Sequence, residues 1–358
     1  MDRLEYFDSF RGLLCISVIL RHQHFETYTL NGFHLGVIGF FILSSFLLTY
    51  RLIKQYESAQ SINTIARITI NYAIMRFFRI YIPFVIYCFI DRYYLKCDIK
   101  QTTTMFKCIK LNYLYRAIHL WTMPIEIRYY FLIPFISILF SRVYKLKLLV
   151  WSLFLVKLFY LAKIKQYKWV KMYEDNQINE LSGYLPIFLA GSILAGLYAN
   201  LEETKWIEKL SNSRIYNYIL TILSLIVFVL IARSHAQYKT VRDDAYLYSA
   251  GITIFMFLLL VSPSNLIAKY LSNEFMLKSI GKYSYGTYLF HKTVIRNNFI
   301  IITFKNYLKI STDLCLATIF ISFCYGFLFS HLVENNSISI AKILIKKVNG
   351  RLPSILKK

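Results

Sequence analysis

The sequence predicts an all-α membrane protein, a helix bundle with about ten transmembrane helices. Of its 358 residues, 57% are hydrophobic and 18% are aromatic, and the mean hydropathy is +0.46. The apolar residues gather in runs that approach the ~17–25 residues a helix needs to cross a bilayer. No segment resembles a soluble domain, a low-complexity tract or an internal repeat. This combination indicates an integral, multi-pass membrane protein, and either a plasma membrane or an endomembrane location fits it.

The candidate spans are apolar stretches separated by polar or basic segments. They cover residues 8–26, 33–53, 78–95, 118–140, 147–164, 182–200, 215–232, 246–262, 283–304 and 314–333. The third is flanked by arginines and the fifth contains Lys157, so these two fit a membrane span least well. Residues 1–8 carry three acidic side chains, unlike the basic start of a signal peptide, and we expect the first span to be retained as a helix.

Basic residues between the spans predict the topology. The segment after the first span has no Lys or Arg, whereas the segment after the second is rich in them, which places the N-terminus in the cytoplasm. An even number of spans returns the C-terminus to the same side. The basic segment between the third and fourth spans disagrees, because this assignment would place it outside. We expect a transmembrane domain over residues 1–336 and a basic, amphipathic cytoplasmic tail over residues 337–358, lying on the membrane surface.

The net charge of +23 would suggest nucleic acid as a partner if the protein were soluble. Here the lysines and arginines lie mostly between the spans, where they would meet anionic lipid headgroups or face an anionic substrate. We therefore expect membrane lipids as partners and no nucleic acid. The six cysteines have no metal-ligand or redox spacing, and we expect neither a metal nor a bound cofactor.

The first span contains two ionisable side chains that fall on nearly one helical face. Arg11, followed by Gly12, and His22 are eleven residues apart, which is about three turns and roughly 16 Å. Ionisable groups at membrane depth are functional candidates, and histidine is the natural general base near neutral pH. The alternative is a snorkelling arginine with a structural histidine, and the nearby His24 makes the choice of base less clear.

Three further positions extend this set of candidates. Arg76 and Arg79 share a helix face before Pro83 and could form a fork for phosphate groups, or could simply be a basic flank. Glu126 lies inside the fourth span, where it could bind a cation, orient His22 or share a proton, or be balanced by Arg128.

Three more candidates lie near the C-terminal end. Tyr288 and His291 share one face of the ninth span, where they could serve the site or could form a buried structural pair. Glu334 ends the tenth span, where an interfacial carboxylate in contact with water is the simpler interpretation.

Taken in order, these motifs resemble the acyltransferase 3 family of integral membrane O-acyltransferases. That family has an Arg-Gly with a histidine eleven residues after the arginine, a glycine- and phenylalanine-rich run, an Arg-x-x-Arg before a proline, a Trp-x-x-x-x-Glu-x-x-x-Tyr segment, a Ser-Tyr-x-x-Tyr-Leu-x-His segment and a closing glutamate. In this chain the first two motifs match Arg11, Gly12 and His22, and residues 36–47. The next two match Arg76, Arg79 and Pro83, and Trp121, Glu126 and Tyr130. The last two match Ser284, Tyr285, Tyr288, Leu289 and His291, and Glu334. Each motif is degenerate, but their shared order is specific and covers nearly the whole chain.

The resemblance implies transfer of an acyl group, acetyl or another short acyl, from acyl-CoA as co-substrate to a hydroxyl of a carbohydrate, a lipid or a small molecule. Arg11, Arg76 and Arg79 would hold the donor's phosphates on the cytoplasmic side. His22 would take the proton from the acceptor hydroxyl, with Glu126 orienting it, balancing its charge or binding the acceptor. Tyr288, His291 and Glu334 would be acceptor-side or structural. No acyl-enzyme is required, and no serine or cysteine nucleophile motif is present.

The chain also departs from the family pattern. The family's frequent acidic residue is Ile38 here, and its Ser-Gly is Ser44-Ser45. A non-catalytic member that handles lipids or small molecules is therefore one alternative, and a membrane transporter with buried ionisable residues is another. Transport would be favoured by inverted repeats, which the sequence does not display. We expect the stand-alone form of the family, without an appended hydrolase-type domain, and the sequence gives no indication of an oligomeric state.

Overall fold

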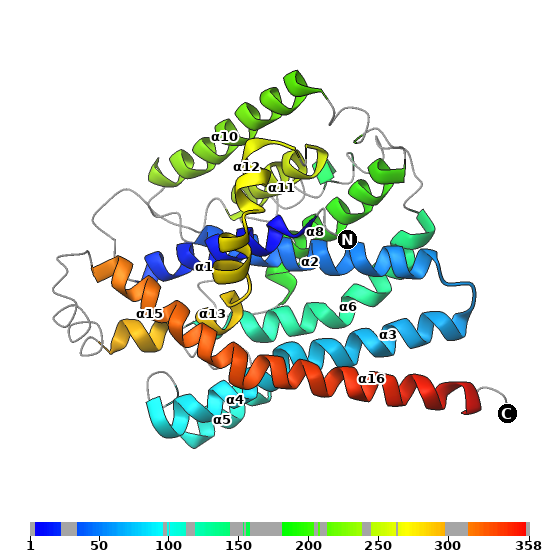
Figure 1. The fold of residues 1–358 in the computed structure, drawn as a ribbon, viewed down its shortest axis with the longest axis vertical. Helices are drawn as coiled ribbons and strands as arrows, with labels where there is room; N and C mark the ends of the chain where they lie inside the picture. Colours follow the sequence, from blue (N-terminus) through cyan, green and yellow to red (C-terminus); the bar gives the residue numbers. More distant parts are fainter. Residues whose placement is uncertain are drawn as a thin grey trace.

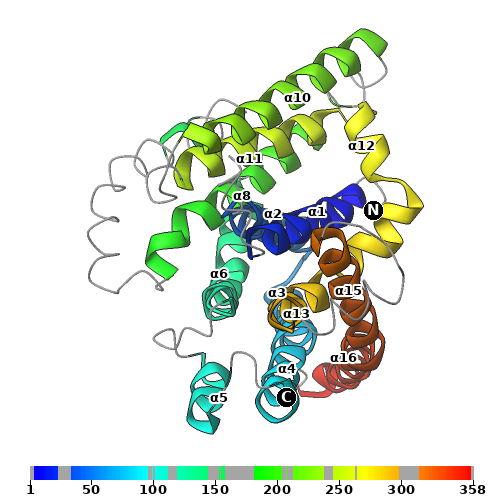
Figure 2. The ribbon, with the colours of Figure 1, turned by 90° about the vertical axis from the view of Figure 1, so that its left-hand side faces the viewer.

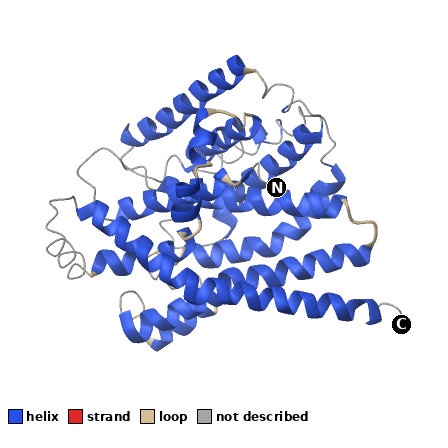
Figure 3. Cartoon of the chain, in the orientation of Figure 1, coloured by secondary structure: helices blue, strands red, loops and turns tan. Residues whose placement is uncertain are grey.

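The computed structural model describes residues 4–22, 34–95, 99, 101–111, 119–143, 153, 155–157, 181–203, 207, 213–237, 245–262, 264–297 and 314–355. Over these residues the chain is helical, and no strand is found in them (Figure 3). The predicted all-α helix bundle is confirmed. Much of the predicted fifth span, 147–164, lies outside the described residues.

Helix α2 (His34–Glu57) forms the centre of the bundle and packs against α1 (Tyr6–His22), α6 (Thr122–Val143), α8 (Leu181–Glu203) and α11 (Ala245–Val261). Small residues let these helices approach closely, as is common where helices pack in membranes. A Cβ at Gly36 would lie 2.6 Å from the Leu14 carbonyl oxygen of α1, and one at Gly191 would overlap the Ser45 hydroxyl. In the view of Figure 2, α8 and α11 lie on one side of α1 and α2.

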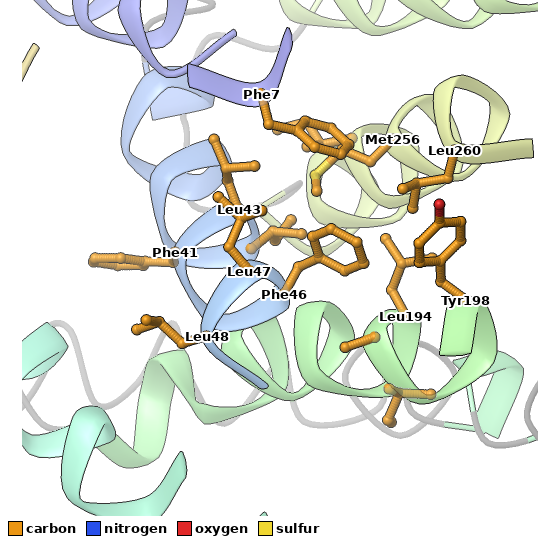
Figure 4. Close-up of a cluster of buried hydrophobic side chains, with 14 of the residues drawn as sticks. Phe7, Phe41, Leu43, Phe46, Leu47, Leu48, Leu194, Tyr198, Met256 and Leu260 are labelled. Carbon is orange, nitrogen blue, oxygen red and sulfur yellow. The ribbon is translucent and has the colours of Figure 1, made fainter. Parts of the chain in front are cut away.

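Figure 4 shows the core where α1, α2, α8 and α11 meet, with Phe7, Phe46, Leu194 and Met256 turned toward one another. A chain of hydroxyl groups crosses the neighbouring contact of α2, α6 and α8. The Ser192 hydroxyl lies 2.9 Å from that of Thr49 and 2.7 Å from that of Tyr129. Because all three groups are buried, their mutual hydrogen bonds remove the penalty of burying them separately.

Two helical runs are longer than the predicted spans that they contain. One passes through α3 (Ile62–Arg76), the π-helical η3 (Phe77–Tyr81), α4 (Ile82–Ile90) and η4 (Asp91–Leu95). It begins where the Ser61 hydroxyl accepts a hydrogen bond from the Thr64 N–H, well before the expected start at residue 78. The other passes through α15 (Leu314–Phe329), the π-helical η6 (Ser330–Glu334) and α16 (Asn335–Ile355).

The second run joins the predicted transmembrane domain to the predicted tail without a break at residue 336. Helix α16 lies beside α3 and η3, and the Ser337 hydroxyl donates a hydrogen bond to the Phe78 carbonyl (Figure 1). The division of the chain at residue 336 and the position of the tail on the membrane surface stay predictions.

The remaining helices surround this framework. They are α5 (Thr102–Ile109), α10 (Arg214–Gln237), α12 (Leu266–Leu271), the π-helical η5 (Met276–Gly281) and α13 (Ser284–Arg296). Helix α10 packs on α11 and α12 and exposes a row of large apolar side chains, among them Ile215, Leu225 and Phe228. An apolar outer face of this kind is expected where the surroundings are hydrocarbon rather than water.

Six helices in the described part of the chain are long and apolar enough to cross a membrane. They cover Gly36–Glu57, Ile62–Leu95, Thr122–Arg142, Tyr184–Glu203, Arg214–Ile231 and Leu316–Gly350. A shorter apolar helix covers Tyr248–Val261. The chain is thus a membrane protein, while the count of ten spans and the cytoplasmic termini stay predictions.

Candidate functional site

A cavity of about 200 Å³ opens where α1, α2, η3, α6, α13 and η6 come together. It unites most of the site residues predicted from the sequence, although they are up to 323 positions apart in the chain. The predicted residues that line it are Arg11, Arg76, Arg79, Glu126, Tyr288 and Glu334. The cavity also has apolar walls from Phe40, Phe41 and Leu47 of α2. Charged groups set in an apolar, helix-lined cavity are typical of a ligand site.

The cations of this cavity come from four helical segments and one turn. Arg11 lies on α1, Arg51 on α2, Arg76 at the end of α3 and Arg79 in η3, and Lys282 precedes α13. Guanidinium groups bind phosphate oxygens through paired N–H donors. The cluster is therefore able to hold a ligand that carries several phosphates.

Two members of this cluster, and one acid, were not predicted as site residues. They are the cations Arg51 and Lys282 and the acid Asp8. Arg11 donates a hydrogen bond from Nη1 to Asp8 Oδ1 at 2.7 Å, so part of its donor capacity is already used. A sequence signal existed, since Asp8 and Arg11 are one helical turn apart.

Glu126 lies with the arginines rather than with the predicted base. Its carboxylate accepts a hydrogen bond from the Tyr130 hydroxyl one turn further along α6. Ser44, at the position of the family's Ser-Gly, and Thr122 line the same part of the cavity. His22 is not among the described residues that line it. The geometry brings Glu126 close to the place where a ligand would lie, which suits charge balance or acceptor binding.

Glu334 is buried in η6, with 8% of its surface exposed. Its Oε1 has no hydrogen-bond partner within the part of the chain that the structure describes. Gly286 on α13 makes room for the carboxylate, because a Cβ there would come within 3.0 Å of Oε1. The structure therefore places Glu334 inside the cavity rather than at a water interface, with an acceptor oxygen available to a ligand.

Tyr288 separates the cavity from a second group of polar side chains. Its hydroxyl donates to the His119 carbonyl at 2.7 Å, and the Thr122 hydroxyl lies 2.7 Å from the same oxygen. Because the single phenolic proton is used on the carbonyl, Thr122 is the donor in the second bond. Both bonds hold the ring in place at the edge of the cavity.

Behind this wall lies a group of three histidines, His22, His119 and His291, which we call the histidine group. The rings of His22 and His291 are stacked with centroids 5.1 Å apart, and His119 meets His291 edge-on at 4.9 Å. The sequence predicted His22 and His291 but missed His119, although it too is a histidine inside a predicted span.

Main-chain carbonyls fix the protonation pattern of the two buried histidines. His291 Nδ1 lies 2.6 Å from the Tyr288 carbonyl, and His119 Nε2 lies 3.0 Å from the Leu289 carbonyl. A carbonyl only accepts, so each of these nitrogens carries a proton. The other nitrogen of His291, Nε2, is then an acceptor, and it has no hydrogen-bond partner in the described residues.

Ile38 offers no substitute for the acid that the family pattern expects. Its side chain is buried in the apolar core of α2. His22 stacks on the ring of His291. No group of three or more His, Cys, Asp or Glu residues in the described segments is arranged to hold a metal ion.

Comparison with known proteins agrees with the order of these motifs. A family described as an acyltransferase domain matches residues 4–336. The O-acetyltransferase OatA of Staphylococcus aureus strain NCTC 8325 / PS 47 is 26% identical over 317 residues, which cover 80% of this chain and 50% of that protein. A second protein named as an O-acetyltransferase, from strain COL, is 25% identical over 333 residues, which cover 82% of this chain and 51% of that protein. The chain thus spans about half the length of these relatives, and no solved structure matches it.

Proposed function

The chain belongs to the acyltransferase family, and on that premise we propose that it is a multi-pass membrane O-acyltransferase that moves a short acyl group from acyl-CoA to a hydroxyl. Two relatives named as O-acetyltransferases favour acetyl as the group transferred. The expected acceptor is a carbohydrate, a lipid or a small hydroxylated molecule. The family match disfavours the transporter alternative, which rested on buried ionisable residues alone.

The observation that carries this proposal is the division of the site into two parts. Arginines and one lysine line the cavity, and the histidine group lies directly behind Tyr288. Acyl-CoA has phosphates at one end and a reactive thioester at the other. A polycationic cavity close to a candidate base is what a reaction with such a donor requires.

In the proposed reaction, His22 removes the proton from the acceptor hydroxyl as its oxygen attacks the thioester carbonyl. The tetrahedral intermediate collapses by breaking the carbon–sulfur bond, and the thiolate takes the proton from His22. The products are the ester and free CoA, and His22 returns to its neutral form. No residue of the chain is acylated.

His291 acts in this scheme as a positioning residue. Its ring is held by the Tyr288 carbonyl and stacks on His22. This contact would orient the His22 imidazole in a chain that has Ile38 in place of the family's frequent acid. Glu126 and Glu334, on the cavity side, would balance the arginines and accept hydrogen bonds from a hydroxylated acceptor.

The test is acyl transfer from radiolabelled acetyl-CoA in membranes that contain the wild-type protein or His22→Ala. We expect the variant to lose about 10²–10⁴-fold in rate, the usual contribution of a positioned general base. His331→Ala is the matched control, because His331 is exposed and does not line the cavity. Equal transfer by His22→Ala and wild type would refute the mechanism, and a folded wild type without any transfer would favour the non-catalytic alternative.

A further inference from the structure

A second hollow adjoins the cavity, and we call it the α3–α16 groove. It has a volume of about 580 Å³ and lies between the C-terminal half of α2, α3 and α16. Leu48, Arg51 and Arg76 line both the groove and the cavity. A ligand could therefore extend from one into the other past these two arginines.

Part of the groove comes from a segment that the family match does not include. Ile345 and Asn349 of α16 line it, whereas the match ends at residue 336. Helix α16 is held in place at its start by the Ser337 hydrogen bond to Phe78. The same helical run carries Glu334 into the cavity one turn earlier, so both hollows share a rigid wall.

Three buried polar atoms face this region without a hydrogen-bond partner among the described residues. They are Asn71 Oδ1, Arg76 Nε and Asn349 Oδ1. An unpaired buried polar atom destabilises a protein, so several in one place indicate a ligand that pairs with them. They come from both walls of the groove, α3 and α16.

The charge of the groove differs from that of the cavity. Arg51, Arg67 and Arg76 line the groove, and no Asp or Glu is among its described lining residues. The cavity, in contrast, contains the carboxylates of Asp8, Glu126 and Glu334. A ligand that fits the groove is therefore strongly anionic over at least part of its length.

The other lining groups suit a nucleobase. Tyr72 and Ile68 of α3 lie opposite Ile345 of α16, and they provide flat or apolar surfaces on which a base can lie. The side-chain amides of Asn71 and Asn349 match the paired donor and acceptor edge of an adenine. Arginines for phosphate groups, an aromatic surface and side-chain amides together match a phosphorylated nucleotide.

We propose that the α3–α16 groove binds the adenosine-phosphate portion of the acyl donor, so that the thioester arm passes Arg51 and Arg76 into the cavity. This inference rests on the proposed function for the identity of the donor. An anionic lipid headgroup carries the same phosphate chemistry, and the experiment separates the two sources.

The probe is adenosine 3′,5′-bisphosphate, which contains the nucleotide but no thioester arm. Its affinity for the full chain is measured by calorimetry in nanodiscs of zwitterionic lipid. We expect Asn349→Ala and Arg67→Gln each to weaken binding by about threefold to tenfold, the effect of losing one hydrogen bond or one charged contact. The matched controls are Asn336→Ala on the same helix and Arg214→Gln on α10, both exposed and outside the groove.

Equal affinity in all variants would overturn the proposal, as would a wild type that does not bind the nucleotide. A lipid site is shown instead if native mass spectrometry finds an anionic lipid on the wild type that is lost from Asn349→Ala, with nucleotide affinity unchanged. Thermal unfolding of each variant checks that Asn349→Ala is folded, and Asn349→Gln, which retains the amide, is expected to keep more affinity. Nucleotide binding without acyl transfer would refute the proposed function alone, whereas transfer without an effect of these variants would refute the groove alone.

Discussion

The cavity and the histidine group share two helices, α1 and α13, but they carry different titratable side chains. The cavity contains five cationic and three acidic side chains, several of them still partly open to solvent. In the histidine group, the buried rings of His119 and His291 are held by main-chain carbonyls. One region is suited to holding a charged ligand and the other to holding a base in one orientation. Binding and proton transfer are therefore expected to respond to different substitutions.

The largest change that would distinguish the cavity from the histidine group is expected from a substitution in the cavity. Arg79→Gln removes a half-buried cation and leaves a shorter polar side chain in its place. We expect the KM for acetyl-CoA to rise about 10–100-fold, since a hydrogen bond to a charged group contributes roughly 1.5–3 kcal/mol. The kcat should change much less. Steady-state kinetics in nanodiscs measure both, with Arg214→Gln as the control, and a fall in kcat at constant KM would break the comparison.

A substitution in the histidine group should give the opposite pattern. His291→Ala removes the ring that stacks on His22, and we expect kcat to fall about tenfold with little change in the KM for acetyl-CoA, because small losses of orientation slow a reaction strongly. His291→Phe keeps a flat ring at that position and should retain more of the rate than His291→Ala. If the two variants are equally slow, the stacking contact is not what positions His22.

The smallest effect is expected at the mouth of the cavity. Asp8→Asn removes an ion pair with Arg11 whose side chains are 49% and 23% exposed. Exposed pairs of this kind stabilise by only ~0–1 kcal/mol, so the unfolding temperature should barely change. The freed Arg11 should lower the KM for acetyl-CoA about twofold. A rise in KM would mean that Asp8 orients Arg11 for the ligand rather than competing with it.

Sequence reasoning found the helix bundle and the family because both depend on local pattern: apolar runs of membrane length, and short motifs in a fixed order. It also grouped Arg11, Arg76 and Arg79, which line one cavity, while their role in donor binding stays a prediction. It missed His119 because a single histidine in an apolar stretch has no spacing partner of its own. Contacts such as that of His119 with His291 join residues 172 positions apart, and no local pattern encodes them.

The helix boundaries show a second limit. Residues 62–76 contain enough polar side chains that a hydropathy criterion excludes them from a span. They are nevertheless helical, because Ser61 caps the first turn and no proline or glycine interrupts the chain before Pro83. For the same reason the α3–α16 groove could not be predicted. The residues of α3 were expected to lie between two spans, and those of α16 were expected to form a separate helix on the membrane surface.

The number of residues in two π-helical segments, η3 and η6, determines how the helices that follow them are oriented. Both long helical runs widen as they pass the cavity, at η3, which carries Arg79, and at η6, which carries Glu334. A π turn accommodates one residue more than an α turn, and one residue corresponds to about 100° of rotation around a helix axis. Deleting a single residue from η6 would therefore turn all of α16 and carry Asn349 away from the groove. Insertions and deletions should therefore be poorly accepted in these two short segments.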